Sequence, residues 1–550
     1  MGKILWPSTF ILSFLLHSFP PISVSAKEAS GFPNVDLGYA VHAATSVDVT
    51  QSGIKLGNYN NIRFAQPPTG NLRFRKPVTP PPKQSEVQNG DMDPTPDCVS
   101  STSPQVPLPG ISGQHSGTED CLFLNVRVPE GAKPGDKLPV IHFIHGGGYT
   151  FGSKDLFHTG QDSIGLFNGT SANERFIFVS HNYRLGLYGW ASSPFEKNMD
   201  ANIGIHDSVA ALEWTKRYID RFGGDPDRIT AFGQDAGAGI ITAMLTSNGG
   251  RGELPFSKAI LSSPNFVPRR RVLSRRQQVY EEMLKAAKCP TLSCLKGLSA
   301  DELRDVNHKL VTEGRNNGGG GTFGPGIGFG PVVDGSYVPD APQVLLQRGR
   351  FHKEVQSVIS SNTLNEGMGM ISDGMPEKFS ALVRTVFPGA NDATVRRIQD
   401  LFQSQASDPA EKLVWDWITS VVFACNSWGI SQAYAKVGDG RGKARRYLFS
   451  APPALHGSDL SYLFYVDQET TSVHDPHIAL QVQSYIRKFL SAKDAELPIP
   501  PGSPDWPLYG QAADIMNMRE AGLEITRDPW DAKDICKTLM DITLDPESGA

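Results

Sequence analysis

The stretch Ile229-Thr230-Ala231-Phe232-Gly233-Gln234-Asp235-Ala236-Gly237 predicts a β-strand that turns abruptly into a helix. Its opening residues suit a strand, and residues 238–245, which follow it, have the composition of a helix. Small residues at both flanks favour a sharp elbow, because the central residue of such a turn is forced into a strained backbone conformation. An elbow of this kind points one side chain into a pocket at the helix N-terminus. Here that side chain belongs to Asp235.

Short runs of β-branched and aromatic residues recur between helical segments on both sides of the elbow. A helix is expected over residues 207–221, and Asp225-Pro226-Asp227 is expected to turn the chain into the elbow strand. Alternation of this sort predicts an α/β fold with a mostly parallel central sheet flanked by helices. The runs are residues 138–145, 176–183, 228–233, 258–263, 355–360 and 446–449.

A second motif, His145-Gly146-Gly147-Gly148-Tyr149, comes directly after one of the predicted strands. Consecutive glycines let backbone N–H groups turn toward an incoming oxygen without obstruction by side chains, which is how an oxyanion hole is built. Alone, the motif would indicate only a glycine turn. Together with the elbow, it indicates a site for acyl-transfer chemistry.

The composition is that of an ordinary globular protein. The 550 residues carry a net charge of −5, with 20% charged and 39% hydrophobic residues, and nothing indicates nucleic-acid binding. Histidines and cysteines show no tight ligand spacing, so neither a metal nor a cofactor is expected. Residues 79–118 and 316–331 are rich in Pro, Ser and Gly, and either could cover a pocket or form a plain surface loop.

The N-terminus resembles a secretory signal peptide. Lys3 precedes an apolar run over residues 4–19, and Val24-Ser25-Ala26 places small residues where a signal peptidase cleaves. We expect cleavage after Ala26, leaving residues 27–550 as one domain, secreted or in the lumen of an endomembrane compartment. The alternative is an N-terminal membrane anchor, although the run is short for one.

Six cysteines suggest up to three disulfides in an oxidising compartment, although fifteen pairings are arithmetically possible. Cys289 and Cys294 can close a local loop, whereas Cys98 and Cys121 bracket a loop of Pro, Gly and Ser. Cys425 and Cys536 remain as the third pair by elimination, and the alternative is that they stay as two buried thiols. Asn168-Gly169-Thr170 is the single glycosylation sequence and predicts a surface loop.

Four further motifs make the chain resemble the type-B carboxylesterase/lipase family, which includes cholinesterases and fungal lipases. The resemblance runs through most of the expected mature chain and implies an α/β-hydrolase fold with loop and helical insertions covering a gorge. The family's disulfide pattern also agrees with the three pairings above. The motifs are residues 64–74 (FAQPPTGNLRF), 119–126 (EDCLFLNV), 182–186 (NYRLG) and 222–226 (FGGDP).

Carried over by position, this resemblance assigns an acidic triad member to Glu366 and a triad histidine to His456. The oxyanion donors fall on the residues Gly147, Gly148 and Ala236.

The nucleophile position departs from the family pattern. The family has Gly-Glu-Ser-Ala-Gly where this chain has Gly233-Gln234-Asp235-Ala236-Gly237, and Ile240 replaces a small polar residue. Acyl transfer needs a neutral hydroxyl that the histidine deprotonates. Asp235 has no proton to give near neutral pH, it tends to hold His456 as imidazolium, and its charge would occupy or repel the oxyanion site. Loss of a triad serine costs on the order of a million-fold, so we expect no efficient esterase activity.

Three functions from different classes fit this departure. Asp235 could itself be the nucleophile of an epoxide or haloalkane hydrolase, with His456 activating water and Glu366 orienting the histidine, or the chain could be a residual carboxylic ester hydrolase. The chain could instead be an adhesion-like module that binds protein partners.

In the third, which the sequence favours, the gorge binds a small hydrophobic molecule without hydrolysing it. The chain resembles fungal, catalytically inactive hydrolase homologues of natural-product pathways that act as dirigent-like proteins. This resemblance implies a role in stereoselective coupling, cyclisation or isomerisation of an aromatic or polyketide-type compound in secondary metabolism, with a laccase-like oxidase or another pathway enzyme as partner.

Overall fold

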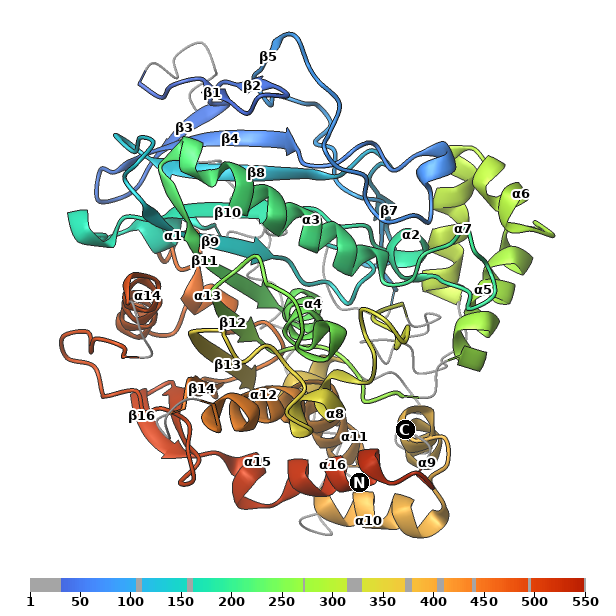
Figure 1. The fold of residues 1–550 in the computed structure, drawn as a ribbon. Helices are drawn as coiled ribbons and strands as arrows, with labels where there is room; N and C mark the ends of the chain where they lie inside the picture. Colours follow the sequence, from blue (N-terminus) through green and yellow to red (C-terminus); the bar gives the residue numbers. More distant parts are fainter. Residues whose placement is uncertain are drawn as a thin grey trace, which may run out of the picture.

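The six predicted strand runs form the centre of one eleven-stranded sheet that crosses the whole molecule, and five further strands flank them (Figure 1). The computed structural model describes residues 31–104, 111–155, 162–270, 273–313, 329–370, 378–402, 410–437, 442–492 and 496–548. In spatial order the strands are β16 (Gly522–Arg527), β15 (Asp514–Arg519), β14 (Ala444–Phe449), β13 (Ser357–Thr363), β12 (Lys258–Ser262), β11 (Gly224–Gln234), β9 (Leu138–Ile144), β10 (Ile177–His181), β8 (Phe123–Pro129), β4 (Lys55–Arg63) and β3 (Ser46–Val49).

The middle of the sheet is parallel, from β10 through β9, β11, β12, β13 and β14 to β15. The margins are antiparallel, with β8, β4 and β3 on one side and β16 on the other. Parallel strands need crossover connections, which the intervening helices supply. The expected α/β fold with a mostly parallel central sheet is therefore confirmed.

Successive side chains of each strand point to opposite faces of the sheet. Both sets are buried in apolar clusters, so both faces of the sheet are covered. On β9, Val140 and Ile144 belong to one apolar cluster, whereas Ile141 and Phe143 belong to another. The first cluster also contains residues of α3 (Ile203–Tyr218), α4 (Ala236–Leu245) and α12 (Cys425–Ala435). The second contains residues of α13 (Leu460–Leu463) and α14 (Pro476–Ser491). The two groups of helices thus cover opposite faces of the sheet.

Two groups of the remaining helices lie at the periphery of the sheet and the helices that cover it. In Figure 1, α5, α6 and α7 gather at one end, and α9, α10 and α16 at another. Their bounds are α1 (Ile164–Phe167), α2 (Gly186–Trp190), α5 (Leu273–Ala286), α6 (Leu292–Gly297), α7 (Ala300–Glu313), α8 (Pro342–Gln347), α9 (Phe379–Val386), α10 (Asp392–Phe402), α11 (Ala410–Ile418), α15 (Pro529–Ala532) and α16 (Ile535–Leu544). Short pieces complete the chain: the strands β1 (Val35–Asp36), β2 (Val41–His42), β5 (Val87–Gln88), β6 (Ser100–Ser101) and β7 (His115–Ser116), and the 3₁₀ turns η2 (Gly70–Leu72), η4 (Ala172–Glu174), η5 (Ile219–Phe222), η6 (Ser247–Gly249) and η7 (Glu366–Gly369).

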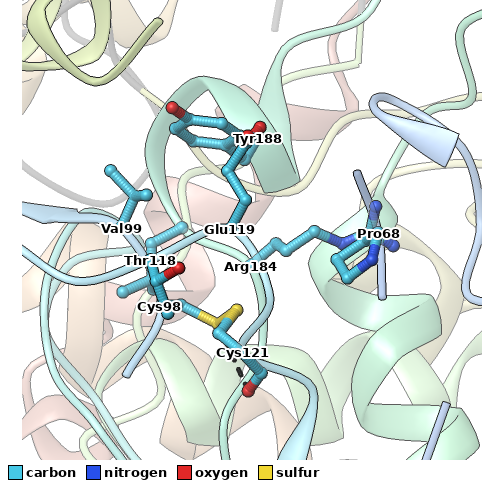
Figure 2. A pocket seen from close by; sticks show the side chains of 9 residues that line it. Pro68, Cys98, Val99, Thr118, Glu119, Cys121, Arg184 and Tyr188 are labelled. Carbon is cyan, nitrogen blue, oxygen red and sulfur yellow. Dashed lines mark hydrogen bonds between the residues drawn. A yellow bond between two sulfur atoms is a disulfide. The ribbon is translucent and has the colours of Figure 1, made fainter. Parts of the chain in front are cut away.

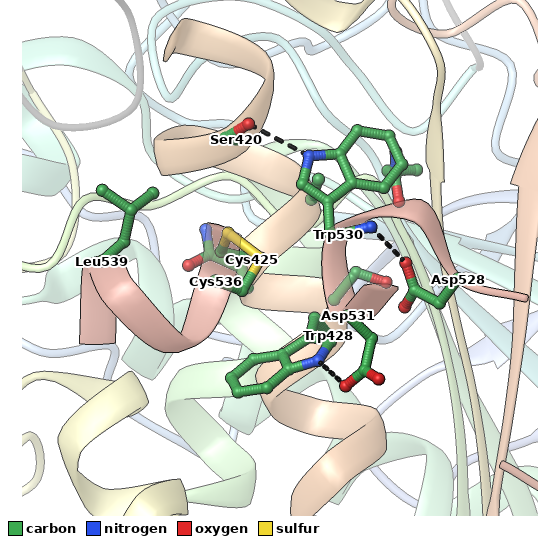
Figure 3. The surroundings of a disulfide bond; sticks show 12 residues. Ser420, Cys425, Trp428, Asp528, Trp530, Asp531, Cys536 and Leu539 are labelled. Atoms are coloured by element: carbon green, nitrogen blue, oxygen red, sulfur yellow. Dashed lines mark hydrogen bonds between the residues drawn. A yellow bond between two sulfur atoms is a disulfide. The ribbon is translucent and has the colours of Figure 1, made fainter. Parts of the chain in front are cut away.

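Three disulfides join the pairs suggested by the sequence: Cys98–Cys121, Cys289–Cys294 and Cys425–Cys536. The pair left open, Cys425 and Cys536, ties α12 to α16 rather than remaining as thiols. Figure 3 shows this bond close to Trp428 and Trp530, whose indole nitrogens donate to Asp531 and Ser420. The bond therefore fastens the C-terminal helices to the helical layer beside β13 and β14.

Several details differ from the sequence-based expectation. Helix α3 begins at Ile203 rather than at residue 207, and residues 225–227 lie within β11, where pairing with β9 slips between Gly224 and Ile229. Asn168 ends α1 with only 9% of its surface exposed, and its amide oxygen accepts from the Gln51 backbone at 3.1 Å. This side chain is therefore packed rather than displayed on a surface loop, and its glycosylation stays a prediction.

Two expectations fall on residues that the structure does not describe. The signal peptide over residues 1–26 lies outside the described residues, as does most of the glycine-rich stretch 316–331.

Candidate active site

The elbow forms as the sequence predicts. Asp235 follows the last residue of β11 and precedes α4, with φ 54° and ψ −119°. A Cβ on Gly233 would lie 2.5 Å from the carbonyl carbon of Gly237, and a Cβ on Gly237 would lie 2.0 Å from the Ile144 carbonyl oxygen. The two flanking glycines are thus required by close backbone approach, and the strained turn they allow fixes the direction of the Asp235 side chain.

The other predicted site residues come from neighbouring strand ends. The glycine segment follows β9, Glu366 lies three residues after β13, and His456 lies in the loop after β14. Because these strands are parallel, their carboxyl ends meet at the same edge of the sheet, which is where α/β proteins place their ligand sites. The structure brings Asp235, Glu366, His456, Gly147 and Gly148 together there.

The Asp235 carboxylate occupies the predicted oxyanion hole. The part formed by the backbone N–H groups of Gly147 and Gly148 is called the glycine hole below. Its Oδ2 accepts hydrogen bonds from the backbone N–H groups of Gly147, at 2.9 Å, and Gly148, at 2.7 Å. Its Oδ1 accepts from the amide Nδ2 of Asn265 at 2.5 Å. The N–H groups that the sequence analysis assigned to an incoming substrate oxygen are therefore bound to an oxygen of the protein itself.

His456 bridges two carboxylates. Its Nδ1 is hydrogen-bonded to Oε2 of Glu366, and its Nε2 lies 3.5 Å from Oδ1 of Asp235. The Glu366 side chain is fully buried, and its Oε1 accepts from the Ser263 hydroxyl at 2.6 Å and from the Thr363 N–H at 2.7 Å. Glu366 is thereby held in one orientation, which in turn orients the imidazole ring.

The electrostatics of the pair favour its charged form. Burial by itself would lower the pKa of His456, but the charge of Glu366 and the hydrogen bonds of Asp235 and Glu366 raise it to about 10. Burial would raise the pKa of Asp235, yet the contact with His456 and the N–H groups of Gly148 and Ala236 lower it to about 2. At neutral pH the site therefore holds an imidazolium between two carboxylates.

Two further side chains contact the imidazole ring. The amide Nε2 of Gln234 lies 3.1 Å from His456 Nε2. A protonated ring donates from Nε2 and cannot accept there, so protonation of His456 requires this amide to turn its oxygen toward the ring. The Phe423 ring lies 4.7 Å from the imidazole, tilted by 36°.

Phe423 belongs to a six-residue π-helix, η9 (Thr419–Ala424), inserted between α11 and α12. The hydroxyl of Thr419 accepts from the backbone N–H of Gly367, in the turn that carries Glu366. π-helical segments are rare and are frequent at functional sites. Here the segment supports both His456 and the Glu366 turn.

Sequence reasoning missed Asn265, Ser263, Phe423 and the η9 segment. Asn265 and Ser263 follow the end of β12, and their position beyond a parallel strand was the signal that could have pointed to them. No local pattern marks Phe423, because its relation to His456 depends on packing between distant segments.

A small pocket lies away from this site, beside the Cys98–Cys121 disulfide (Figure 2). Its two charged members are already paired, Glu119 with Arg73 at 2.5 Å and Arg184 with Asp207 at 2.6 Å. The buried hydroxyl of Tyr188 also borders it. We interpret this pocket as a packing gap. It is lined by Pro68, Cys98, Val99, Thr118, Glu119, Cys121, Arg184, Leu185 and Tyr188.

The described residues contain neither a candidate metal cluster nor a membrane-spanning helix. No three or more His, Cys, Asp or Glu side chains gather there in a way that could hold a metal ion. Over the same ranges, no helix has the length and apolar character needed to cross a membrane.

The sheet, the elbow, the glycine hole and the Glu366–His456 pair together define an α/β-hydrolase site whose turn carries an aspartate. Residues 44–532 match the model of the Carboxylesterase family, and the chain belongs to that family. It is similar to Carboxylesterase patB of Penicillium expansum, with 29% identity over 554 residues that cover 90% of this chain and 94% of that one. A secreted lipase of Arthroderma benhamiae is 28% identical over 457 residues, covering 78% and 85% of the two chains. Among solved structures, EstA of Aspergillus niger matches with a TM-score of 0.79 and 25% identity, over 94% of this chain and 99% of that one.

Proposed function

We propose that this protein does not hydrolyse esters, and that it binds a small aromatic or polyketide-type natural product and guides its stereoselective coupling, cyclisation or isomerisation. A laccase-like oxidase or another pathway enzyme would perform the reaction itself. The proposed location is the secretory pathway. The three disulfides and the similarity to secreted lipases support that location.

The observation that carries the proposal is the Asp235 carboxylate in the glycine hole. An ester carbonyl needs those N–H groups free to stabilise the oxyanion, and it needs a hydroxyl to attack it. Asp235 supplies no hydroxyl and its oxygen occupies the donors. The charge that Asp235 and Glu366 hold on His456 further removes the base that would accept a proton.

Retention of the surrounding architecture supports a binding role rather than general decay of the site. Glu366 is still held by two donors, and the imidazole still lies between two carboxylates. The His456 side chain keeps 22% of its surface exposed, so the ion pair is accessible from outside the core. A protein that uses its surface alone to bind partners would have no need of such an arrangement.

A second candidate function is hydrolysis with Asp235 as nucleophile. The placement of Oδ2 in the glycine hole favours it, because that oxygen can carry charge while Oδ1 attacks a carbon. Attack on a haloalkane would form a C–O bond and release halide, and water would then cleave the resulting ester. Against this function, Oδ1 already accepts a 2.5 Å hydrogen bond from Asn265, and a carboxylate with a pKa of about 2 is a weak nucleophile.

The proposal is tested by coupling hydroxylated naphthalenes with a purified laccase in the presence and absence of this protein. Probes are 2-naphthol, 2,3-dihydroxynaphthalene and methyl 3-hydroxy-2-naphthoate, and chiral chromatography measures the enantiomer ratio of each dimer. We expect an enantiomeric excess that requires the protein. The excess should be lost in His456→Gln and kept in His477→Gln, whose exposed histidine lies in the first turn of α14. Racemic dimers from all three probes would refute stereochemical guidance of phenol coupling.

The competing function has its own assay. Mass spectrometry of the protein after incubation with an epoxide and haloalkane panel would reveal an alkyl ester on the peptide that contains Asp235. Such an adduct, together with release of halide or diol, would select the second candidate.

A further inference from the structure

The side chains of His456 and Asp235 present a hydrogen-bond donor and a hydrogen-bond acceptor side by side. Nε2 of His456 lies 3.5 Å from Oδ1 of Asp235, which is longer than a well-formed N–H···O hydrogen bond. In the ion pair, Nε2 is a donor that lies 3.1 Å from the Gln234 amide, and Oδ1 is an acceptor that keeps a further lone pair beside its hydrogen bond from Asn265. A ligand atom placed against both would have to accept a hydrogen bond from the ring and donate one to the carboxylate.

We propose that the Asp235–His456 pair recognises a phenolic hydroxyl group of the bound molecule. This inference rests on the proposed function, and it names the chemical group through which the ligand is held. The phenol oxygen would accept from Nε2 of His456, and its hydrogen would be donated to Oδ1 of Asp235.

The occupied glycine hole excludes the ligands that the fold usually accepts. An ester carbonyl or an ether can accept hydrogen bonds but cannot donate one. The N–H groups of Gly147 and Gly148 are bound to Oδ2, so a carbonyl finds no free donor there and meets a negative carboxylate. The site has thus changed from one that donates to a carbonyl into one that accepts from a hydroxyl.

Acidity separates a phenol from an aliphatic alcohol. Phenols ionise near pH 10, far more readily than alcohols, and the more acidic O–H makes the stronger hydrogen bond to an ionised acceptor. The approach runs over the imidazole, since the His456 side chain is 22% exposed whereas that of Asp235 is 5% exposed. The proposal therefore places the aromatic ring that carries the hydroxyl on the exposed side of the imidazole.

The inference is tested by isothermal titration calorimetry at pH 6 with four matched probes. These are 2-naphthol, its methyl ether 2-methoxynaphthalene, its ester 2-naphthyl acetate, and the saturated alcohol trans-2-decalol. Loss of a hydrogen bond to a charged group costs about tenfold or more in affinity. We therefore expect 2-naphthol to bind the wild type at least about tenfold more tightly than each of the other three probes.

Asp235→Asn is the matched variant, because the amide has the same size but lacks the charge and one acceptor oxygen. We expect the preference for 2-naphthol over its methyl ether to fall to less than about threefold. Asp235→Ala, checked by circular dichroism, serves the same purpose if the asparagine variant does not fold. Equal binding of naphthol and methyl ether to the wild type, including no measurable binding of either, would overturn the inference, as would a preference that survives in the variants.

Failure of this inference can be told apart from failure of the proposed function. An enantiomeric excess in the coupling assay without a hydroxyl preference would leave the function standing and reject the phenol contact. A hydroxyl preference with racemic coupling would support the phenol contact and reject stereochemical guidance.

Discussion

The backbone nitrogen of Gly148 lies 2.7 Å from Oδ2 of Asp235, so an N–H group of the glycine hole is bound to the side chain at the elbow. Oxyanion-hole donors are effective because they are fixed in place before the substrate arrives. In this protein the same fixed donors stabilise a permanent carboxylate. The geometry of the hole is kept, and its donors bind the protein's own carboxylate.

Asp235→Ser should create esterase activity. The substitution frees the N–H groups of Gly147 and Gly148, supplies a hydroxyl, and removes one of the two charges that hold His456 protonated. We expect kcat/KM for para-nitrophenyl acetate to rise on the order of 100-fold over the wild type. Asp235→Ala, which frees the hole without supplying a nucleophile, is the control and should stay near the wild-type rate. Brisk wild-type turnover that disappears in Asp235→Ala would contradict the absence of ester hydrolysis.

The ion pair should make stability depend on pH. The pKa of His456 is raised from 6.5 to about 10 in the folded protein, so its stabilisation is fully present below about pH 6.5 and is lost as the pH rises toward 10. We expect the stability difference between the wild type and His456→Gln to shrink by on the order of 3 kcal/mol over that interval. Thermal unfolding followed by circular dichroism from pH 5 to 10 measures it. A difference independent of pH would argue against a charged His456.

The presence of Asp235 should make glutamine more favourable than glutamate at position 234. A glutamate at position 234 would add a third carboxylate to the two that already flank His456, because Nε2 of the present amide lies 3.1 Å from the ring. We expect Gln234→Glu to destabilise the wild type by about 1–2 kcal/mol, and to cost less in the Asp235→Ser background. A double-mutant cycle of unfolding free energies measures the coupling. Equal costs in both backgrounds would show that the two positions are independent.

The three disulfides should differ in their contribution to stability. Cys425 and Cys536 are 111 residues apart, whereas Cys289 and Cys294 are five apart. Closing the longer loop removes more entropy from the unfolded chain, about 5 against about 2 kcal/mol. The double variant Cys425→Ser/Cys536→Ser should therefore melt well below Cys289→Ser/Cys294→Ser at the same scan rate. The reverse order would mean that local packing, rather than loop length, decides.

The fold and the elbow could be predicted from the sequence because their signals are local. The runs of β-branched residues around β9, β11 and β12 alternate with helical segments, and the glycines beside Asp235 are adjacent to it in the chain. The resemblance also pointed to Glu366 and His456, which the structure brings to the same sheet edge. The sequence does not decide whether the aspartate occupies or repels the oxyanion site. The structure resolves this, because Oδ2 accepts from both glycine N–H groups.

Other parts of the site depend on contacts that no local pattern encodes. Asn265 lies 30 residues from Asp235, and its amide reaches the carboxylate only because β11 and β12 pair in parallel. The π-helix that presents Phe423 to His456 is a wider turn inside a longer helical run, and its amino-acid composition does not distinguish it from the flanking helices. The packing of Asn168 against Gln51 depends on a contact across 117 positions.

The carboxylate at the elbow also decides how this protein will behave in chemical proteomics. Fluorophosphonate probes label serine hydrolases by forming a bond to the nucleophilic serine, and Asp235 offers no hydroxyl to phosphonylate. Organophosphate inhibitors of carboxylesterases should leave the protein untouched for the same reason. Surveys that count hydrolases by such labelling will therefore pass over this chain, even where it is abundant.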